Sequence, residues 1–126
     1  MRRRLRGVRL VGCTIVSEAN RRDHWATKKR RGDAQRLVAR AGLKAAIATL
    51  KPHDRGILTR GAVVIRLVRY AARKLDTDNL ASGFKAIRDE VAKVLGHDDG
   101  PDAPIIWEYD QSTDRPHGAG IEIWTK

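Results

Sequence analysis

Two aspartates separated by one residue, Asp76 and Asp78, are the side chains of this sequence best placed to do chemistry. They belong to the run Asp-Thr-Asp-Asn at 76–79, which lies between an apolar, strand-like stretch and a helical one. If the backbone is extended there, both carboxylates point to one face and can share a divalent cation, because hard cations such as Mg²⁺ take oxygen ligands. Aspartate is also a common helix N-cap, and for the pair alone capping is the simpler interpretation.

Other motifs that could use these residues do not fit. An EF-hand loop beginning at Asp76 would need an oxygen ligand, a glycine and a glutamate where Leu80, Ala81 and Ile87 stand. The sequence has no glycine-rich phosphate loop, no paired cysteines for zinc and no convincing serine triad. The single cysteine, Cys13, excludes an intrachain disulfide and is expected to be a small buried strand residue. A metal site here would therefore be built from carboxylates.

The formal net charge of +11 is distributed unevenly along the chain. Residues 1–51 carry 15 Lys and Arg against 3 Asp and Glu, whereas residues 52–126 carry 11 against 12. A basic half joined to a half with acidic clusters predicts one surface for phosphates and one pocket for cations. A solvated, arginine-rich surface without a ligand is the alternative.

Residues 18–32 form a strongly basic segment, which we interpret as a loop that binds nucleic acid. Trp25 stands among its cations, so the indole could stack on a base or sugar while the cations contact phosphates. The sequence leaves open the alternative that Trp25 anchors the loop to the core. The predicted DNA-binding residues are Arg21, Arg22, Trp25, Lys28, Lys29, Arg30 and Arg31.

Apolar periodicity predicts strands at 8–16 and 62–70 and two helices. The first helix, 33–50, has Asp33 as its N-cap and ends before Pro52, because proline disfavours helix in the preceding residue. The second, 79–95, carries one apolar stripe and stops at Gly96. Two further segments, 105–110 and 121–124, are expected to close the fold as a β-hairpin.

The order strand, helix, strand, helix, strand, strand predicts an α/β fold, with one domain over 1–126, a mixed sheet and two main helices. Residues 1–6 are expected to form a disordered basic tail. Arg6 and Arg9 interrupt the N-terminal apolar stretch and leave it too short for a secretory signal or a membrane span. We therefore expect a cytoplasmic protein.

The acidic motif and its surroundings together resemble the RusA-like family of Holliday junction resolvases. The similarity rests on Leu-Asp-Thr-Asp-Asn-Leu at 75–80, Phe-Lys-Ala-Ile-Arg-Asp at 84–89, the pair Asp98-Asp99 and Trp-Glu-Tyr at 107–109. The basic region 20–40, which leads into a helix, also resembles the N-terminal part of that family. The resemblance covers most of residues 18–124, and its specific element is the Asp-x-Asp-Asn motif with the later aspartate pair.

The resemblance implies a RusA-like fold and a homodimeric, Mg²⁺-dependent endonuclease that cuts four-way DNA junctions in recombination and repair, with Mn²⁺ as an alternative metal. It implies metal ligands and catalytic residues at Asp76, Asp78 and Asp99, with Asp98 as a further ligand beside them. The family lysine expected four residues after the second motif aspartate is Ser82 in this chain. Lys85, about one turn later, is the predicted catalytic substitute.

A continuous helix over 79–95 would be about 25 Å long and would separate Asp78 from Asp99. A break near Gly83, a fold-back of the 97–104 turn or a site shared with a second subunit could bring the two together. We favour the shared site, because a twofold dimer suits the symmetry of a junction. The main alternative function is a non-catalytic, basic nucleic-acid-binding protein of the same fold, and a third is a nuclease for other branched or flapped DNA.

Overall fold

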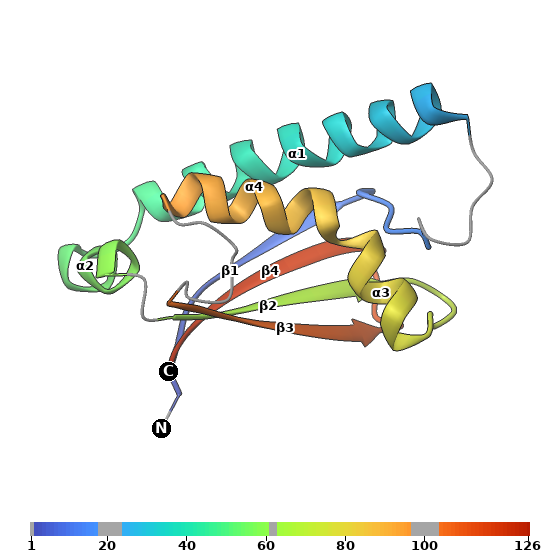
Figure 1. Cartoon of the computed structure of the whole chain (residues 1–126). Coiled ribbons are helices and arrows are strands. Elements are labelled where there is room, and N and C mark those ends of the chain that lie inside the picture. The colour runs from blue at the N-terminus through green and yellow to red at the C-terminus, as the bar shows by residue number, and fades with distance from the viewer. Residues whose placement is uncertain (1, 18–23, 61–62, 97–103) are drawn as a thin grey trace.

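The computed structural model of the chain describes residues 2–17, 24–60, 63–96 and 104–126, which form one small α/β domain (Figure 1). In these ranges a mixed sheet of four strands is combined with four helices. The elements in chain order are β1 (Arg4–Val11), α1 (Trp25–Ala48), α2 (Pro52–Arg60), β2 (Val63–Tyr70), α3 (Thr77–Gly83), α4 (Lys85–Leu95), β3 (Ile105–Ser112) and β4 (Gly118–Thr125).

The strand order in the sheet is β1-β4-β2-β3. β2 and β3 are parallel, and the connection between them carries α3 and α4, whereas β4 runs antiparallel to both β1 and β2. The predicted hairpin of the last two strands is therefore wrong, since β2 lies between β3 and β4. Alternation of apolar residues predicts a strand and its buried face, but it does not specify the neighbouring strand.

One face of the sheet is covered by α1 and α4, which run side by side across it (Figure 1). The apolar stripe of α4 buries Ile87 and Val91 against the sheet, and Phe84, at the α3–α4 junction, is also fully buried. The inward positions of β2 and β4 complete this core with Ile65, Leu67, Ile121 and Ile123. Burial of these side chains from both layers is what fixes α4, and with it α3, on the sheet.

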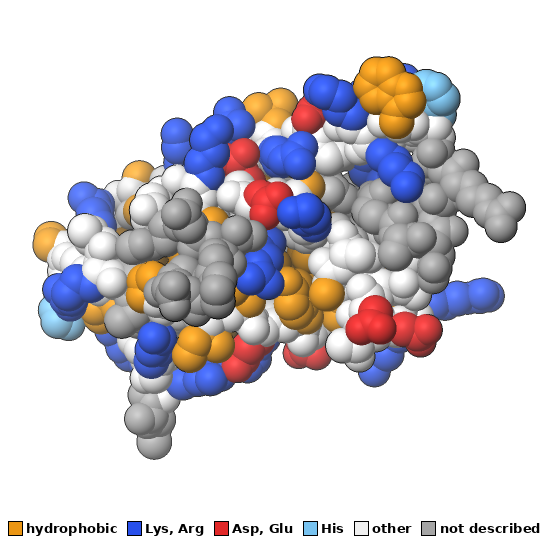
Figure 2. Space-filling view, in the orientation of Figure 1, with side chains coloured by type: hydrophobic (Ala, Val, Ile, Leu, Met, Phe, Trp, Pro, Cys, Tyr) orange, Lys and Arg blue, Asp and Glu red, His pale blue; other side chains and the backbone are white. Residues whose placement is uncertain are grey.

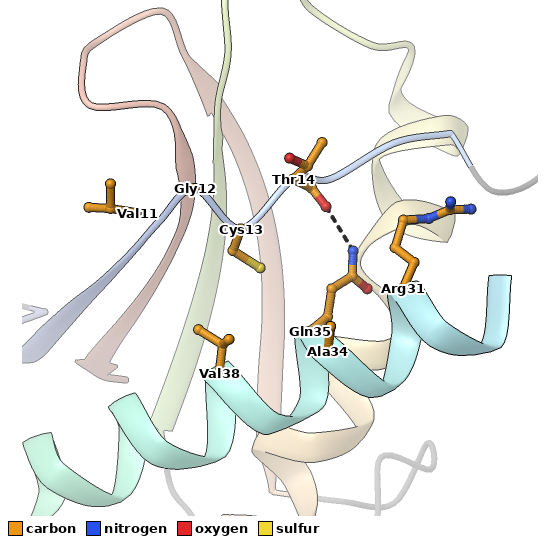
Figure 3. Close-up of a pocket in the computed structure, with 8 residues that line it drawn as sticks. All are labelled: Val11, Gly12, Cys13, Thr14, Arg31, Ala34, Gln35 and Val38. Carbon is orange, nitrogen blue, oxygen red and sulfur yellow. Dashed lines mark hydrogen bonds between the residues drawn. The ribbon is translucent and has the colours of Figure 1, made fainter. Parts of the chain in front are cut away.

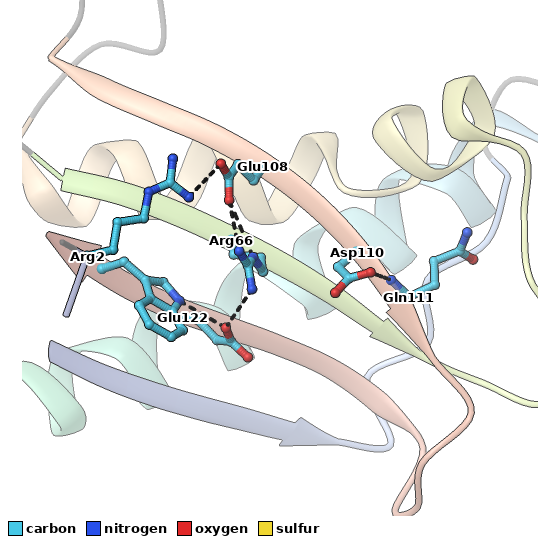
Figure 4. A network of polar contacts seen from close by, with 7 residues as sticks. Arg2, Arg66, Glu108, Asp110, Gln111 and Glu122 are labelled. Atoms are coloured by element: carbon cyan, nitrogen blue, oxygen red, sulfur yellow. Dashed lines mark hydrogen bonds and ion pairs between the residues drawn. The ribbon is translucent and has the colours of Figure 1, made fainter. Parts of the chain in front are cut away.

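The opposite face of the sheet carries a network of charged side chains (Figure 4). Arg66 of β2 lies 3.2 Å from Glu108 of β3 and 3.9 Å from Glu122 of β4. Arg2 adds a second cation at 2.9 Å from Glu108, and its hydrogen bond is the main reason why the pKa of that carboxyl lies below its usual range. Glu108 and Glu122 are thus both paired with arginine within the protein.

The structure corrects the predicted start of the first helix and of the first strand. α1 begins at Trp25, so residues 25–32 are helical and the predicted basic loop is wrong there. Lys, Arg and Ala favour helix even without an apolar stripe, and the His24 side chain caps the first turn by accepting a hydrogen bond from Ala26 N at 3.2 Å. β1 begins at Arg4, so residues 4–6 are paired with β4 rather than in a tail.

Two helix boundaries also differ from the prediction. The segment after Pro52, for which the sequence predicted no helix, forms the short helix α2. Proline occupies its first position, where the missing N–H costs nothing. The predicted helix over 79–95 is split into α3 and α4 at Phe84. A Cβ on Gly83 would lie only 2.5 Å from the carbonyl oxygen of Val16, so the chain after β1 packs directly on the break.

Candidate functional site: an acidic pair beside a cationic groove

The acidic pair lies at the edge of the sheet where the parallel strands β2 and β3 end. The chain leaves β2, with Ala71 N–H donating to Ser112 O at 3.0 Å, and enters α3 at Thr77. Figure 1 shows α3 beside the arrowhead of β3. Ligands of open α/β sheets commonly bind at the carboxyl ends of parallel strands, so the position is suitable for a functional site.

Asp76 occupies the N-cap position of α3, but its side chain makes no capping hydrogen bond. Its backbone is extended, with φ −63° and ψ 156°, whereas Asp78 already lies in the first helical turn. The extended backbone that the sequence suggested for the motif therefore holds for Asp76 alone. Both side chains are exposed, and neither makes a hydrogen bond or ion pair with any residue in the described ranges.

The segment before the pair is fixed by Gln111 of β3, a residue that the sequence did not single out. Its side-chain amide donates to Leu75 O and accepts from Leu75 N, both at 2.8 Å. In Figure 4 the Gln111 side chain projects from β3 away from Asp110. This double hydrogen bond ties the residue preceding Asp76 to the sheet, so it sets where α3 begins.

The two carboxylates provide oxygen ligands of the kind that Mg²⁺ and Mn²⁺ prefer. Across the described part of the chain, no three His, Cys, Asp or Glu side chains converge in a metal-binding cluster. The predicted further ligands, Asp98 and Asp99, lie outside the described residues. Asp76 and Asp78 supply oxygen donors of a type that suits a hard cation, and two side chains alone do not complete a coordination shell.

Lys85 and Ser82 meet in one groove although a helix break separates them. The groove lies between α1 and the α3–α4 junction, and its charged or polar lining includes Lys28, Arg36, Ser82 and Lys85. The Lys85 ammonium donates to Asp89 at 3.2 Å, and the Ser82 hydroxyl donates to Asn79 O at 3.1 Å. Ser82 and Lys85 were predicted to share a face of one helix; they lie on two helices and line one groove, and the Lys85 ammonium is directed along α4.

Trp25 is 69% exposed at the start of α1, so it does not anchor this segment to the core. The interpretation that it serves as an anchor is wrong. Lys28, Lys29, Arg30 and Arg31 lie in the first two turns of the same helix, and Lys29 pairs with Asp33 at 2.8 Å. Figure 2 shows Lys and Arg side chains along α1 and acidic side chains gathered over α3. Arg21 and Arg22 lie outside the described residues.

A second hollow, of about 220 Å³, lies between the end of β1 and α1 (Figure 3). Cys13 is buried at its wall, as expected, but it follows the end of β1 instead of lying in a strand. Burial raises the pKa of its thiol. Gln35 closes one side by donating to Thr14 O at 2.8 Å. The lining is mainly apolar, with Val11 and Val38 at the rim and Arg31 as its cation, so it does not extend the acidic site.

Comparisons with protein-family models, curated proteins and solved structures found no match for this chain. None of the helices in the described ranges is long and apolar enough to cross a membrane.

Proposed function

We propose that the protein is a metal-dependent, structure-specific DNA endonuclease of the RusA-like type, which resolves four-way junctions in the cytoplasm during recombination and repair. One observation carries the proposal: two exposed carboxylates without partners in the described ranges stand at the carboxyl edge of the sheet in a chain of net charge +11. Phosphate binding explains the positive charge, and a bound cation explains acids left unpaired amid so many bases.

In this proposal Asp76 and Asp78 hold Mg²⁺ or Mn²⁺, with Asp98 and Asp99 as additional ligands. The bound ion supplies Lewis acidity, so a water becomes a better nucleophile and charge on the scissile phosphate is neutralised. Gln111 orients the segment that carries Asp76. Lys85 would move from the half-buried Asp89 toward the phosphate and offset the negative charge that develops on it. Attack of the water on phosphorus would break the bond to the 3′ oxygen, so the products would carry a 3′-hydroxyl and a 5′-phosphate.

The cations in the first two turns of α1 and the exposed Trp25 would hold the DNA. Lys and Arg contact backbone phosphates without reading sequence, and an exposed indole can stack on an unpaired base at a branch point. The same features suit a nucleic-acid-binding protein without catalytic activity. The distinction between these functions therefore rests on the acidic pair.

A homodimer would complete the site. Gly96, the last described residue before Asp98 and Asp99, lies at the far end of α4, and α4 alone is about 16 Å long. Three residues of extended chain reach at most about 11 Å, which favours Asp99 of one subunit meeting Asp78 of another. Mixed dimers of Asp78→Asn and Asp99→Asn subunits should then regain nicking activity, since each contains one intact site. Absence of recovery would contradict the shared site.

The proposal is tested by incubation with a synthetic four-way junction and with a linear duplex of the same length, with and without Mg²⁺. We expect paired cuts near the branch point of the junction, no cutting of the duplex and no cutting without the metal. A protein that binds the junction with a strong salt dependence but never cuts it in Mg²⁺ or Mn²⁺ would be the non-catalytic alternative. Cutting of flaps but not of four-way junctions would indicate the related nuclease.

A further inference from the structure

The groove beside the acidic pair draws its charge from two helices that are distant in sequence. α1 contributes Lys28 and Arg36, and the start of α4 contributes Lys85. The groove has a volume of about 190 Å³, and Ser82 and Gly83 of α3 also line it. Three cationic residues around one hollow create a positive potential that favours an anion.

Gly32 lies in the groove lining, where α1 packs against α4. A Cβ on Gly32 would lie 3.8 Å from the Cβ of Ala86 and 3.2 Å from the guanidinium of Arg36. Lys28, one turn earlier on α1, lines the same groove as Ser82. Glycine costs roughly 1 kcal/mol relative to alanine within a helix, so its presence inside α1 calls for a packing reason.

The acids paired with Arg36 and Lys85 lie at the protein surface: Asp33 is exposed and Asp89 is half-buried. Arg36 lies 3.2 Å from Asp33, and Lys85 lies 3.2 Å from Asp89, both within one helical turn. Lys85 and Asp33 are more than half exposed in these pairs. Exposed pairs of this kind contribute little, so a phosphate entering the groove can replace the carboxylates as the partner of the cations.

We infer that this groove is a subsite for a DNA backbone phosphate. Lys28 and Arg36 of α1 supply there the positive charge that is missing because Ser82 stands where a lysine was expected. Asp78 precedes Ser82 by four residues, about 6 Å along α3, so the phosphate held here lies at or next to the one facing the acidic pair. The inference depends on the proposed function in one respect, namely that the ligand is DNA. It does not require that the DNA be cut.

The test compares two double variants with the same charge. Lys28→Gln/Lys85→Gln removes one lysine from α1 and one from α4 at the groove, and Lys44→Gln/Lys93→Gln removes one from each helix outside it. Binding of a fluorescent four-way junction is measured by anisotropy in EDTA over a series of salt concentrations. We expect the groove variant to bind about tenfold more weakly, with a salt slope reduced by about 1 to 2, and the control to stay close to wild type.

Equal loss of affinity in the two double variants would overturn the subsite, and so would a wild-type protein that does not bind the junction. Cleavage by the wild type in Mg²⁺ is scored separately. If the wild type binds the junction and never cuts it, the nuclease proposal fails, but the salt slopes still test whether the groove binds a DNA phosphate. If it cuts and both variants bind alike, the groove fails and the nuclease stands.

Discussion

The acidic side chains in the described ranges differ in their partners. Glu90, only 3% exposed, accepts two hydrogen bonds from Arg40 at 3.2 Å, and Glu108 is bound by two arginines of the open sheet face. Asp76 and Asp78 have no such partner in the described ranges, although 26 Lys and Arg residues are present in the chain. Glu90 and Glu108 link separate elements of the fold, whereas Asp76 and Asp78 remain available to a ligand.

Loss of one unpaired carboxylate should have the largest effect on activity. Asp78→Asn removes a ligand charge from an exposed position, so we expect cleavage to fall by at least about 100-fold while junction binding and thermal stability stay near wild type. The measurement is the single-turnover cleavage rate in Mg²⁺. Asp114→Asn, at an exposed acid of the β3–β4 turn, is the matched control and should cut normally. Normal cleavage by Asp78→Asn would exclude its role as a ligand.

The next largest effect is expected at Lys85. Lys85→Ala should lower the cleavage rate about 30-fold, because the variant loses the positive charge that offsets the charge on the phosphate. Folding should be unchanged, because the Lys85 ammonium is exposed and its ion pair is with Asp89 of the same helix. Ser82→Lys in the same background should restore much of the rate, since Ser82 lines the same groove. A double variant as slow as Lys85→Ala would show that the groove does not serve the reacting phosphate.

A smaller effect is expected at Gln111, because this residue acts only by positioning the segment that leads into α3. Gln111→Leu keeps the size of the side chain but breaks both bonds to Leu75, so α3 loses its tie to β3. We expect the cleavage rate to fall about fivefold to tenfold and the Mg²⁺ concentration for half-maximal rate to rise. Gln111→Glu can still accept a hydrogen bond from Leu75 N, so its cleavage rate should lie between those of wild type and Gln111→Leu. An unchanged Mg²⁺ dependence in Gln111→Leu would show that Gln111 does not position the metal-binding segment.

The paired acids should affect stability and not chemistry. Arg40→Leu leaves the Glu90 carboxylate buried without its main partner, so we expect the midpoint of thermal unfolding to fall by about 5 °C and cleavage to persist. The hydrogen bond from Arg40 lowers the pKa of Glu90, so this contribution is present above the unfolded pKa and is lost as the pH falls through the lower folded pKa. An equal midpoint for Arg40→Leu and wild type at pH 7 would contradict the comparison.

The sequence predicted the α/β class, β2 and the core face of α4, because their apolar residues recur at the period of the element. It missed the start of α1, where Lys, Arg and Ala favour helix without an apolar stripe. It also paired β3 with β4 wrongly. The choice of β2 as their common neighbour depends on the crossover through α3 and α4, which no local pattern encodes.

The same division applies to the candidate site. Asp76, Asp78 and Lys85 could be named from residue type and spacing within one segment. Gln111 lies 36 residues from its partner Leu75, so only the folded sheet brings them together. The meeting of α1 cations with Ser82 likewise depends on the helix crossing at Gly32, a contact that neither segment shows alone.

Direct binding of a metal ion to the acidic pair is the most immediate test. Mn²⁺ is titrated into the protein without DNA, and the free ion is followed by electron paramagnetic resonance in wild type, in Asp76→Asn/Asp78→Asn and in the control Asp110→Asn/Asp114→Asn. We predict saturable binding in the wild type and the control, and its loss in the Asp76/Asp78 variant. Identical binding curves for all three proteins would contradict the assignment of these two carboxylates to a cation.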